Sequence, residues 1–139
     1  MIDVLASPVA QSLLHSRIPA RLGYLDPAGA PRVVPVWFHW DGTHIVLGTF
    51  PRSSKLKALR DGSLVAVSID SETYPYQGLQ LRGPVTLTPT AGLVPEYVTA
   101  ARRYLDPAEA DQFLSRLGDR PMVRITLHVQ HAHLLDMRA

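Results

Sequence analysis

The chain of 139 residues contains no cysteine. Disulfide bonds, cysteine zinc sites and thiol catalysis are therefore excluded. No apolar run approaches the roughly 18 residues that a membrane-spanning helix needs. The first ten residues carry an early Asp3 and no basic region, which is unlike a signal peptide. These absences predict a soluble, cytoplasmic protein.

Lysine is scarce as well, because Lys55 and Lys57 are the only two, and arginine supplies the other basic side chains. The 14 basic and 12 acidic residues leave a net charge of +2. That charge is too small for a dedicated nucleic-acid or membrane-surface protein. Since 46% of the residues are hydrophobic, we expect one domain over residues 1–139 with a core of ordinary size.

Alternating apolar residues predict six strands. We expect them at residues 20–26, 31–40, 43–49, 64–70, 78–88 and 122–135. Asp41-Gly42 is typical of a hairpin turn, Gly83-Pro84 predicts a bend inside the fifth strand, and Pro35 favours an edge position for the second. Tight turns between successive strands indicate antiparallel pairing, and closure would hide the sheet edges. The sequence therefore predicts a mainly β fold, a small six-stranded antiparallel closed or split barrel.

Four short helices are expected around this barrel, at residues 7–17, 53–61, 90–105 and 106–117. Two of them begin with a capping residue followed by proline at the first helical position, namely Ser7-Pro8 and Asp106-Pro107. Gly62 and Gly118 are typical of helix ends. The inserted helix 53–61 and the helical pair 90–117 interrupt the series of strands.

The segment from Thr49 to Arg60 reads Thr-Phe-Pro-Arg-Ser-Ser-Lys-Leu-Lys-Ala-Leu-Arg. A predicted strand ends here and a helix begins, so hydroxyl groups, free backbone N–H groups and cations meet. This combination suits a phosphate, which accepts hydrogen bonds from such groups. Two lysines two residues apart on a short helix are also a common form of solvated surface charge, so the lysines alone do not decide between the two interpretations.

Several segments resemble the pyridoxamine 5′-phosphate oxidase-like family of FMN-binding split barrels. They are residues 26–38, with Pro31-Arg32-Val33-Val34-Pro35-Val36-Trp37, residues 41–49 and residues 52–60, followed by 74–83 and 103–105. Together they place the resemblance over about residues 18–136. It implies a split barrel of the FMN-binding type and a homodimer that binds its flavin in the cleft between two subunits.

The resemblance also implies which residues contact the cofactor. The flavin ring would lie against the second strand, and the phosphate would be bound at the junction before the inserted helix. A glutamine that the oxidases place near the ring falls close to Gln77 or Gly78. The implied cofactor-binding residues are Val34, Pro35, Val36, Trp37, Thr49, Arg52, Ser53, Ser54, Lys55, Lys57 and Gln77.

The chain departs from the vitamin B6 oxidases in one important respect. It shows no basic C-terminal segment of the kind that binds the substrate phosphate in those enzymes, so pyridoxine phosphate is not the expected substrate. The Lys-x-Lys-x-Leu element resembles a small branch of the family that contains enzymes using the deazaflavin coenzyme F-420 as well as FMN proteins. The expected cofactor is FMN, with the deazaflavin as the alternative.

No local Ser-His-Asp motif and no paired carboxylates indicate hydrolytic chemistry, and no acid–base residue stands out. In flavin enzymes the cofactor carries the hydride step. We therefore expect a flavin-dependent oxidoreductase that acts on a small organic substrate. A non-catalytic flavin- or haem-binding carrier or sensor is the alternative. His131 and His133 share one face of a strand, but such histidines are commonly half-buried or interface groups, and no metal site is expected.

Overall fold

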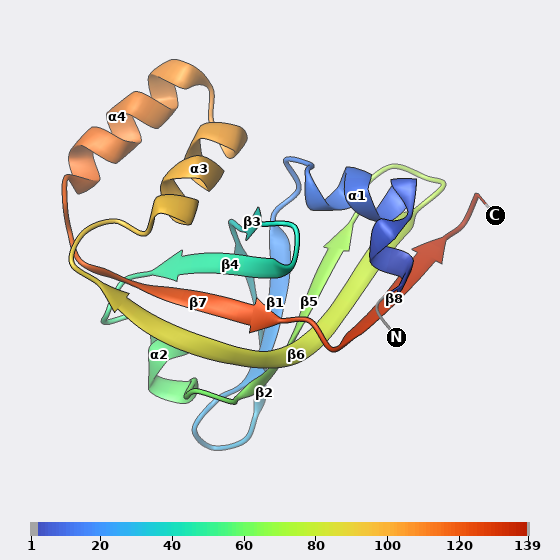
Figure 1. Cartoon of the computed structure of the whole chain (residues 1–139), viewed down its shortest axis with the longest axis horizontal. Helices are drawn as coiled ribbons and strands as arrows, with labels where there is room; N and C mark the ends of the chain where they lie inside the picture. The colour runs from blue at the N-terminus through green and yellow to red at the C-terminus, as the bar shows by residue number, and fades with distance from the viewer. Residues whose placement is uncertain (1–2, 139) are drawn as a thin grey trace.

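Residues 3–138 are described by a computed structural model, in which eight antiparallel strands form one strongly curved sheet with helices at its margins (Figure 1). The sheet runs in the order β2-β1-β5-β6-β7-β4-β3, and β8 pairs with β6. The strands are β1 (Ala20–Leu25), β2 (Pro31–Val36), β3 (His39–Trp40), β4 (His44–Thr49), β5 (Leu64–Asp70), β6 (Gln77–Thr90), β7 (Met122–His128) and β8 (His131–Asp136). This confirms the mainly β, split-barrel fold, and β2 lies at an edge of the sheet as Pro35 predicts.

The described residues form eight strands rather than the six expected, because two of the predicted strands are each divided in two. The strand expected at 31–40 ends at Val36, and His39–Trp40 pair separately with β4 as β3. The strand expected at 122–135 breaks after His128. Before the break it pairs with the second half of β6, and after it with the first half. A strand that pairs first with one half of β6 and then with the other must break in between. The alternation of apolar residues does not reveal which segment a strand pairs with.

The bend in β6 joins the two halves of the sheet. A Cβ atom at Gly83 would overlap the carbonyl oxygen of His128, and the N–H of Gln130 donates to the carbonyl oxygen of Arg82 at 2.8 Å. The link between β7 and β8 therefore crosses β6 so closely that only glycine fits. This crossing confirms the predicted bend at Gly83-Pro84.

The helices are η1 (Asp3–Ala6), α1 (Pro8–Leu14), α2 (Ser54–Ala58), α3 (Pro95–Tyr104) and α4 (Pro107–Leu117). The hydroxyl of Ser7 accepts the N–H of Ala10, as expected for an N-cap. Helix α3 begins at Pro95 rather than near residue 90, because β6 extends to Thr90 and residues 91–94 form the turn that leaves it. The last of these helices starts and ends as predicted, with Asp106 at the N-cap and Gly118 at φ +62°. Among residues 3–138, none of these helices has the length and apolar content needed to cross a membrane.

The core lies on the concave face of the sheet. It contains fully buried side chains from most of the strands, including Leu22, Ile45, Ile69, Leu81, Ile125 and Leu127, together with Phe38. The opposite surface of β1, β2, β5, β8 and the first half of β6 is not covered by any segment within residues 3–138. On this surface, called the outer face below, Val33 and Leu64 are 69% and 71% exposed.

Candidate functional site

A cavity of about 710 Å³ lies where the ends of β2 and β4 meet α2, α3 and α4. Seven of the eleven residues predicted to bind a cofactor line it. They are Pro35, Val36, Trp37, Thr49, Arg52, Ser53 and Lys55. The structure therefore brings the predicted phosphate segment and the predicted ring segment to the same cavity, although they are separate in the sequence.

The other four predicted residues do not line this cavity. Val34 packs against the hydrophobic core, Ser54 and Lys57 are exposed on α2, and Gln77 opens β6 opposite Asp136 of β8. Their contact with a cofactor stays a prediction.

The positive charge in the cavity comes from Arg52 and Lys55, and no acidic residue lines it. Lys55 is half-buried, and this burial lowers the pKa of its ammonium group. No carboxylate within residues 3–138 forms an ion pair with Arg52 or Lys55. A cation that is partly desolvated and has no counter-ion favours an anionic ligand. Binding of the anion would raise the pKa of the cation back toward its usual value.

Ser53 adds an unused hydrogen-bonding group at the same end. Its hydroxyl oxygen is buried and has no hydrogen-bond partner among the described residues. Ser53 is the N-cap residue of α2, yet its side chain makes no capping bond. Leaving such a group unsatisfied costs about 1–3 kcal/mol. The hydroxyl is therefore available to a ligand.

Helix α2 itself contributes little to anion binding. It has only five residues, Ser54–Ala58, and the field of so short a helix is weak. The sequence suggested that the start of this helix would help to bind a phosphate. In the structure, the ammonium of Lys55 and the hydroxyl of Ser53 are the partly buried polar groups of this segment that lack a partner among the described residues.

Four aromatic side chains line the rest of the cavity: Trp37, Phe50, Tyr97 and Phe113. The ring of Trp37 lies 5.7 Å from that of Tyr97 and 5.3 Å from that of Phe113, measured between centroids. Burial raises the pKa of the Tyr97 phenol, so this group keeps its proton at neutral pH. The aromatic residues make this part of the cavity apolar and flat-walled.

The sequence did not indicate that Tyr97 and Phe113 belong to the site. Tyr97 follows the apolar periodicity of a helix, which is also the pattern of an ordinary core position. Only the fold shows that α3 lies against β3 and β4 and that α4 packs on α3 (Figure 1). Pro19, Gly48 and Phe50 line the cavity as well and were also missed.

Gly48 explains how α3 approaches the strand so closely. A Cβ atom at this position would lie 2.8 Å from the Cβ of Tyr97 and 3.0 Å from the Cε of Met122. Real side chains do not approach so closely. The absence of a side chain at residue 48 therefore lets Tyr97 rest on β4 at the cavity wall.

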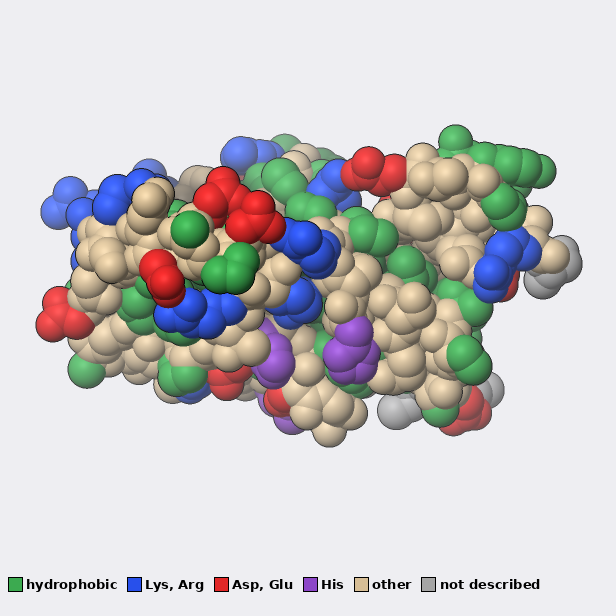
Figure 2. All heavy atoms as spheres, turned by 90° about the horizontal axis from the view of Figure 1, so that it is seen from above, with side chains coloured by type: hydrophobic (Ala, Val, Ile, Leu, Met, Phe, Trp, Pro, Cys, Tyr) green, Lys and Arg blue, Asp and Glu red, His purple; other side chains and the backbone are tan. Residues whose placement is uncertain are grey.

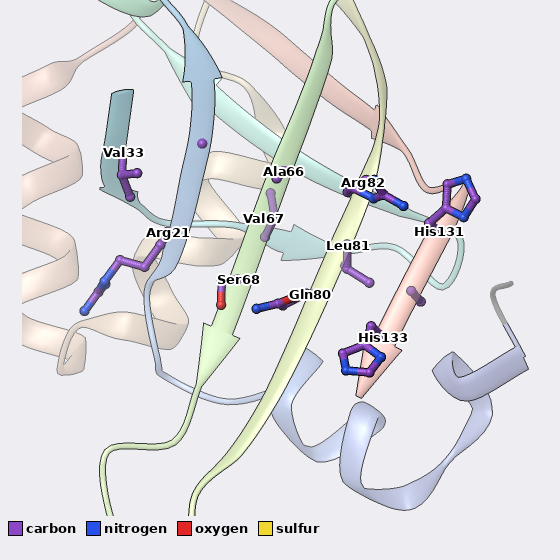
Figure 3. A pocket seen from close by; sticks show the side chains of 12 residues that line it. Arg21, Val33, Ala66, Val67, Ser68, Gln80, Leu81, Arg82, His131 and His133 are labelled. Carbon is purple, nitrogen blue, oxygen red and sulfur yellow. The ribbon is translucent and has the colours of Figure 1, made fainter. Parts of the chain in front are cut away.

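The outer face carries two further hollows, of about 590 and 740 Å³. Figure 3 shows the first, in which Gln80 and Arg82 on β6 lie beside His133 and His131 on β8. None of the predicted cofactor-binding residues lines either hollow. Within the described part of the chain, no group of three or more histidine or acidic side chains is placed to hold a metal ion.

Comparisons with known proteins agree with this fold. An F420 reductase structure shares 25% identity, covering 88% of this chain and 94% of that one with a TM-score of 0.68. The haem-storage protein HutZ from Vibrio cholerae shares 14%, covering 94% and 93% with a TM-score of 0.65. The FAD-binding protein from Mycobacterium smegmatis shares 12%, covering 89% and 92% with a TM-score of 0.56. A comparison with curated proteins finds no match.

The latter two likenesses, at 14% and 12% identity, establish the fold and nothing further. At the level of sequence families, residues 6–133 match the family described as pyridoxamine 5′-phosphate oxidase. This match spans nearly the whole chain and includes every residue that lines the cavity. The chain therefore belongs to the pyridoxamine 5′-phosphate oxidase family.

Proposed function

We propose that this protein is a flavin-dependent oxidoreductase that binds FMN, or alternatively the deazaflavin coenzyme F-420, in the cavity between β2, β4, α2 and α3. One observation carries the proposal. The cation of Lys55 and the unpartnered hydroxyl of Ser53 meet at one end of a cavity whose other walls are apolar and aromatic. An anionic tail attached to a flat ring system has the matching chemistry.

The residues present fit such a cofactor. A charge-assisted hydrogen bond to a phosphate oxygen is among the stronger polar contacts in proteins, and Lys55 and Ser53 both offer a donor. The cavity volume of about 710 Å³ falls within the usual range of roughly 300–1,000 Å³ for small-molecule and cofactor sites. Pro35 and Val36 offer an apolar surface at the edge strand β2.

When bound, the cofactor supplies hydride transfer to or from an organic substrate. The chain contributes binding, orientation and exclusion of water. Lys55 and Ser53 hold the anionic end, Pro35 and Val36 of β2 face the ring, and the aromatic side chains beyond the ring exclude water. No histidine or carboxylate lines the cavity. We therefore assign no side chain the role of a general acid or base that would ionise near neutral pH.

The deazaflavin is the alternative for two reasons. The similar structure at 25% identity is an F420 reductase, and this coenzyme carries an oligoglutamate tail beyond its phosphate. Exposed Lys57 and Arg60 lie on the same segment as Lys55 and would attract such a tail. The haem-binding alternative has less support, because the cavity contains no histidine that would coordinate iron.

We further propose that the protein is a homodimer in which the outer face of one copy covers the cavity of the other. Val33 and Pro35 project on the same side of β2, and Pro35 lines the cavity while Val33 lines the outer hollows. The exposed Val33, Leu64 and Leu25 on this face are apolar side chains of the kind that interfaces bury. A partner seated there would reach the open rim of the cavity.

Identification of the cofactor tests the proposal. We expect purified protein to be yellow with a flavin-type visible spectrum, or to bind added coenzyme F-420 with a change in its fluorescence, and mass spectrometry to identify the bound molecule. Steady turnover with an electron donor would then separate an enzyme from a carrier. Protein that retains neither cofactor and binds neither in titration would contradict the assignment.

A further inference from the structure

The aromatic wall is held rigidly from outside the cavity, beginning with Trp37. Its ring stacks on that of Tyr104, with centroids 5.5 Å apart and planes 9° from parallel. The hydroxyl of Tyr104 donates to the carbonyl oxygen of Ile18 at 3.0 Å, and Arg103 donates to that of Phe38 at 2.6 Å. Tyr104 does not line the cavity, so these contacts fix Trp37 from behind and leave its cavity side free.

Tyr97 is fixed by its neighbours on α3 and β4. The adjacent Glu96 accepts a hydrogen bond on Oε1 from Nε of Arg124 on β7 at 2.9 Å, and Nη2 of Arg124 lies 2.9 Å from the same oxygen. Both side chains are largely buried. A hydrogen-bonded ion pair of this kind restricts the orientation of both partners. Together with the space left by Gly48, it sets the distance between α3 and the sheet.

Phe113 reaches the cavity from α4. Its ring meets that of Trp37 edge-on at 68°, and its centroid lies 6.4 Å from that of Tyr97. The outside of the helical pair is polar, with an ion pair of 2.9 Å between Arg102 and Asp111. Figure 2 shows basic and acidic side chains interspersed over this end of the molecule, at the left of the view. The pair therefore directs its aromatic side chains inward and its charges outward.

Three rings from three separate segments, the β2–β3 link, α3 and α4, thus form one corner. We call it the aromatic corner: Trp37, Tyr97 and Phe113. Aromatic rings attract other flat rings through face and edge contacts beyond the contribution of buried area. The cations Arg52 and Lys55 and the absence of carboxylates in the same cavity disfavour a positively charged guest. A flat ring that is neutral or negatively charged satisfies both conditions.

We propose that the aromatic corner is the substrate subsite and that it selects flat, conjugated ring compounds, neutral or anionic, over saturated ones. This proposal rests on the proposed function, in which the cofactor occupies the end of the cavity near Lys55, Ser53 and Pro35. Tyr97 and Phe113 are then specificity-determining residues, contributed by the helical pair.

Calorimetric titration tests this selection directly. Protein saturated with its cofactor is titrated with 2-naphthoate and with decahydro-2-naphthoate, which has the same skeleton and charge but is not flat. We expect 2-naphthoate to bind about tenfold more tightly. Phe113→Leu and Tyr97→Leu keep an apolar side chain without the ring and should each reduce this preference to about twofold, while Leu114→Ala, on α4 but not lining the cavity, should preserve it.

The affinity for the cofactor is measured on the same variants, and we expect it to stay within about twofold of the original. Equal binding of the two naphthoates by the original protein would overturn the proposal. Loss of cofactor affinity in Phe113→Leu and Tyr97→Leu would overturn it as well, because the corner would then hold the cofactor ring. If no cofactor binds, the same titration of cofactor-free protein still tests the preference for flat rings, so the two proposals fail separately.

Discussion

At the scale of single residues, Ser53 and Lys55 share one physical property: each is partly buried without a partner in the described chain. The hydroxyl of Ser53 has no hydrogen bond, and Lys55 has no counter-ion. Both conditions are unfavourable for the protein alone and become favourable once an anion binds. This opposition between stability and binding has measurable consequences.

Replacing Ser53 by alanine should move stability and cofactor affinity in opposite directions. Ser53→Ala removes a buried unsatisfied hydroxyl, so we expect the cofactor-free protein to be unchanged or up to about 1 kcal/mol more stable in chemical denaturation. The same change removes a donor to the phosphate, so cofactor affinity should fall by about 1 kcal/mol. A parallel loss of stability and affinity would instead show a structural role for the hydroxyl.

The lowered pKa of Lys55 predicts that cofactor affinity falls at alkaline pH. The phosphate binds the protonated ammonium, which is lost at a pH below the usual value of 10.5. Lys55→Arg should remove this decline, because arginine stays protonated. Cofactor titrations at a series of pH values from neutral to alkaline measure this decline in affinity. If the affinity of Lys55→Arg declines in the same way, a group other than Lys55 loses the proton.

The lowered pKa of Lys55 has the opposite effect on folding: as pH rises, stability should increase while cofactor affinity falls. Between the lowered pKa and 10.5, the unfolded chain binds more protons at Lys55 than the folded chain does. The free energy of unfolding of the cofactor-free protein should therefore rise with pH through this window, as far as Lys55 contributes. This contribution of Lys55 to the rise in unfolding free energy with pH should be absent in Lys55→Ala.

At the scale of elements, the position of α3 depends on Gly48. Gly48→Ala places a Cβ atom against Tyr97 and Met122, so we expect α3 to shift and the protein to lose about 1–3 kcal/mol of stability. Gly92→Ala is the matched control, since its Cβ would meet nothing nearer than 3.7 Å. Chemical denaturation of both variants measures the difference, and equal stabilities would contradict the close approach.

The sequence predicted elements better than their arrangement. Alternating apolar residues located the strands, and the capping pair Asp106-Pro107 located the start of α4, because these signals are local. The break between β7 and β8 was missed because it depends on which half of β6 lies alongside. Likewise, the junction at Ser53 and Lys55 was recognisable from residue types, whereas Tyr97 and Phe113 reach the site only through the packing of α3 and α4.

At the scale of the whole molecule, the outer face is the surface on which a single copy of the chain leaves apolar side chains exposed. It includes the small or apolar residues Gly23, Val33 and Ala66, together with Arg21 and Arg82. In Figure 3, Arg21 on β1 and Arg82 on β6 lie on the two sides of Ala66 on β5, and Val33 lies on the edge strand β2. Apolar side chains that are this exposed on the surface of a sheet favour association with a second copy.

A charge placed in this face should separate the subunits. Val33→Glu would bury an unpaired carboxylate in the proposed interface, so we expect the dissociation constant of the dimer to rise at least about 100-fold. Gln112→Glu, on the exposed side of α4, adds the same charge away from the face and should leave the dimer intact. Analytical ultracentrifugation measures both, and a Val33→Glu protein that stays dimeric would move the interface elsewhere.

The central claim is that an anionic cofactor tail binds at Lys55, and the two lysines of this chain provide the most direct measurement. Lys55 lines the cavity, whereas Lys57 is exposed outside it. In fluorescence titrations with FMN and with coenzyme F-420, we predict that Lys55→Ala weakens binding by about 1.5–3 kcal/mol, while Lys57→Ala changes the affinity for FMN less than twofold. Equal affinities for Lys55→Ala and the unchanged protein would contradict the account.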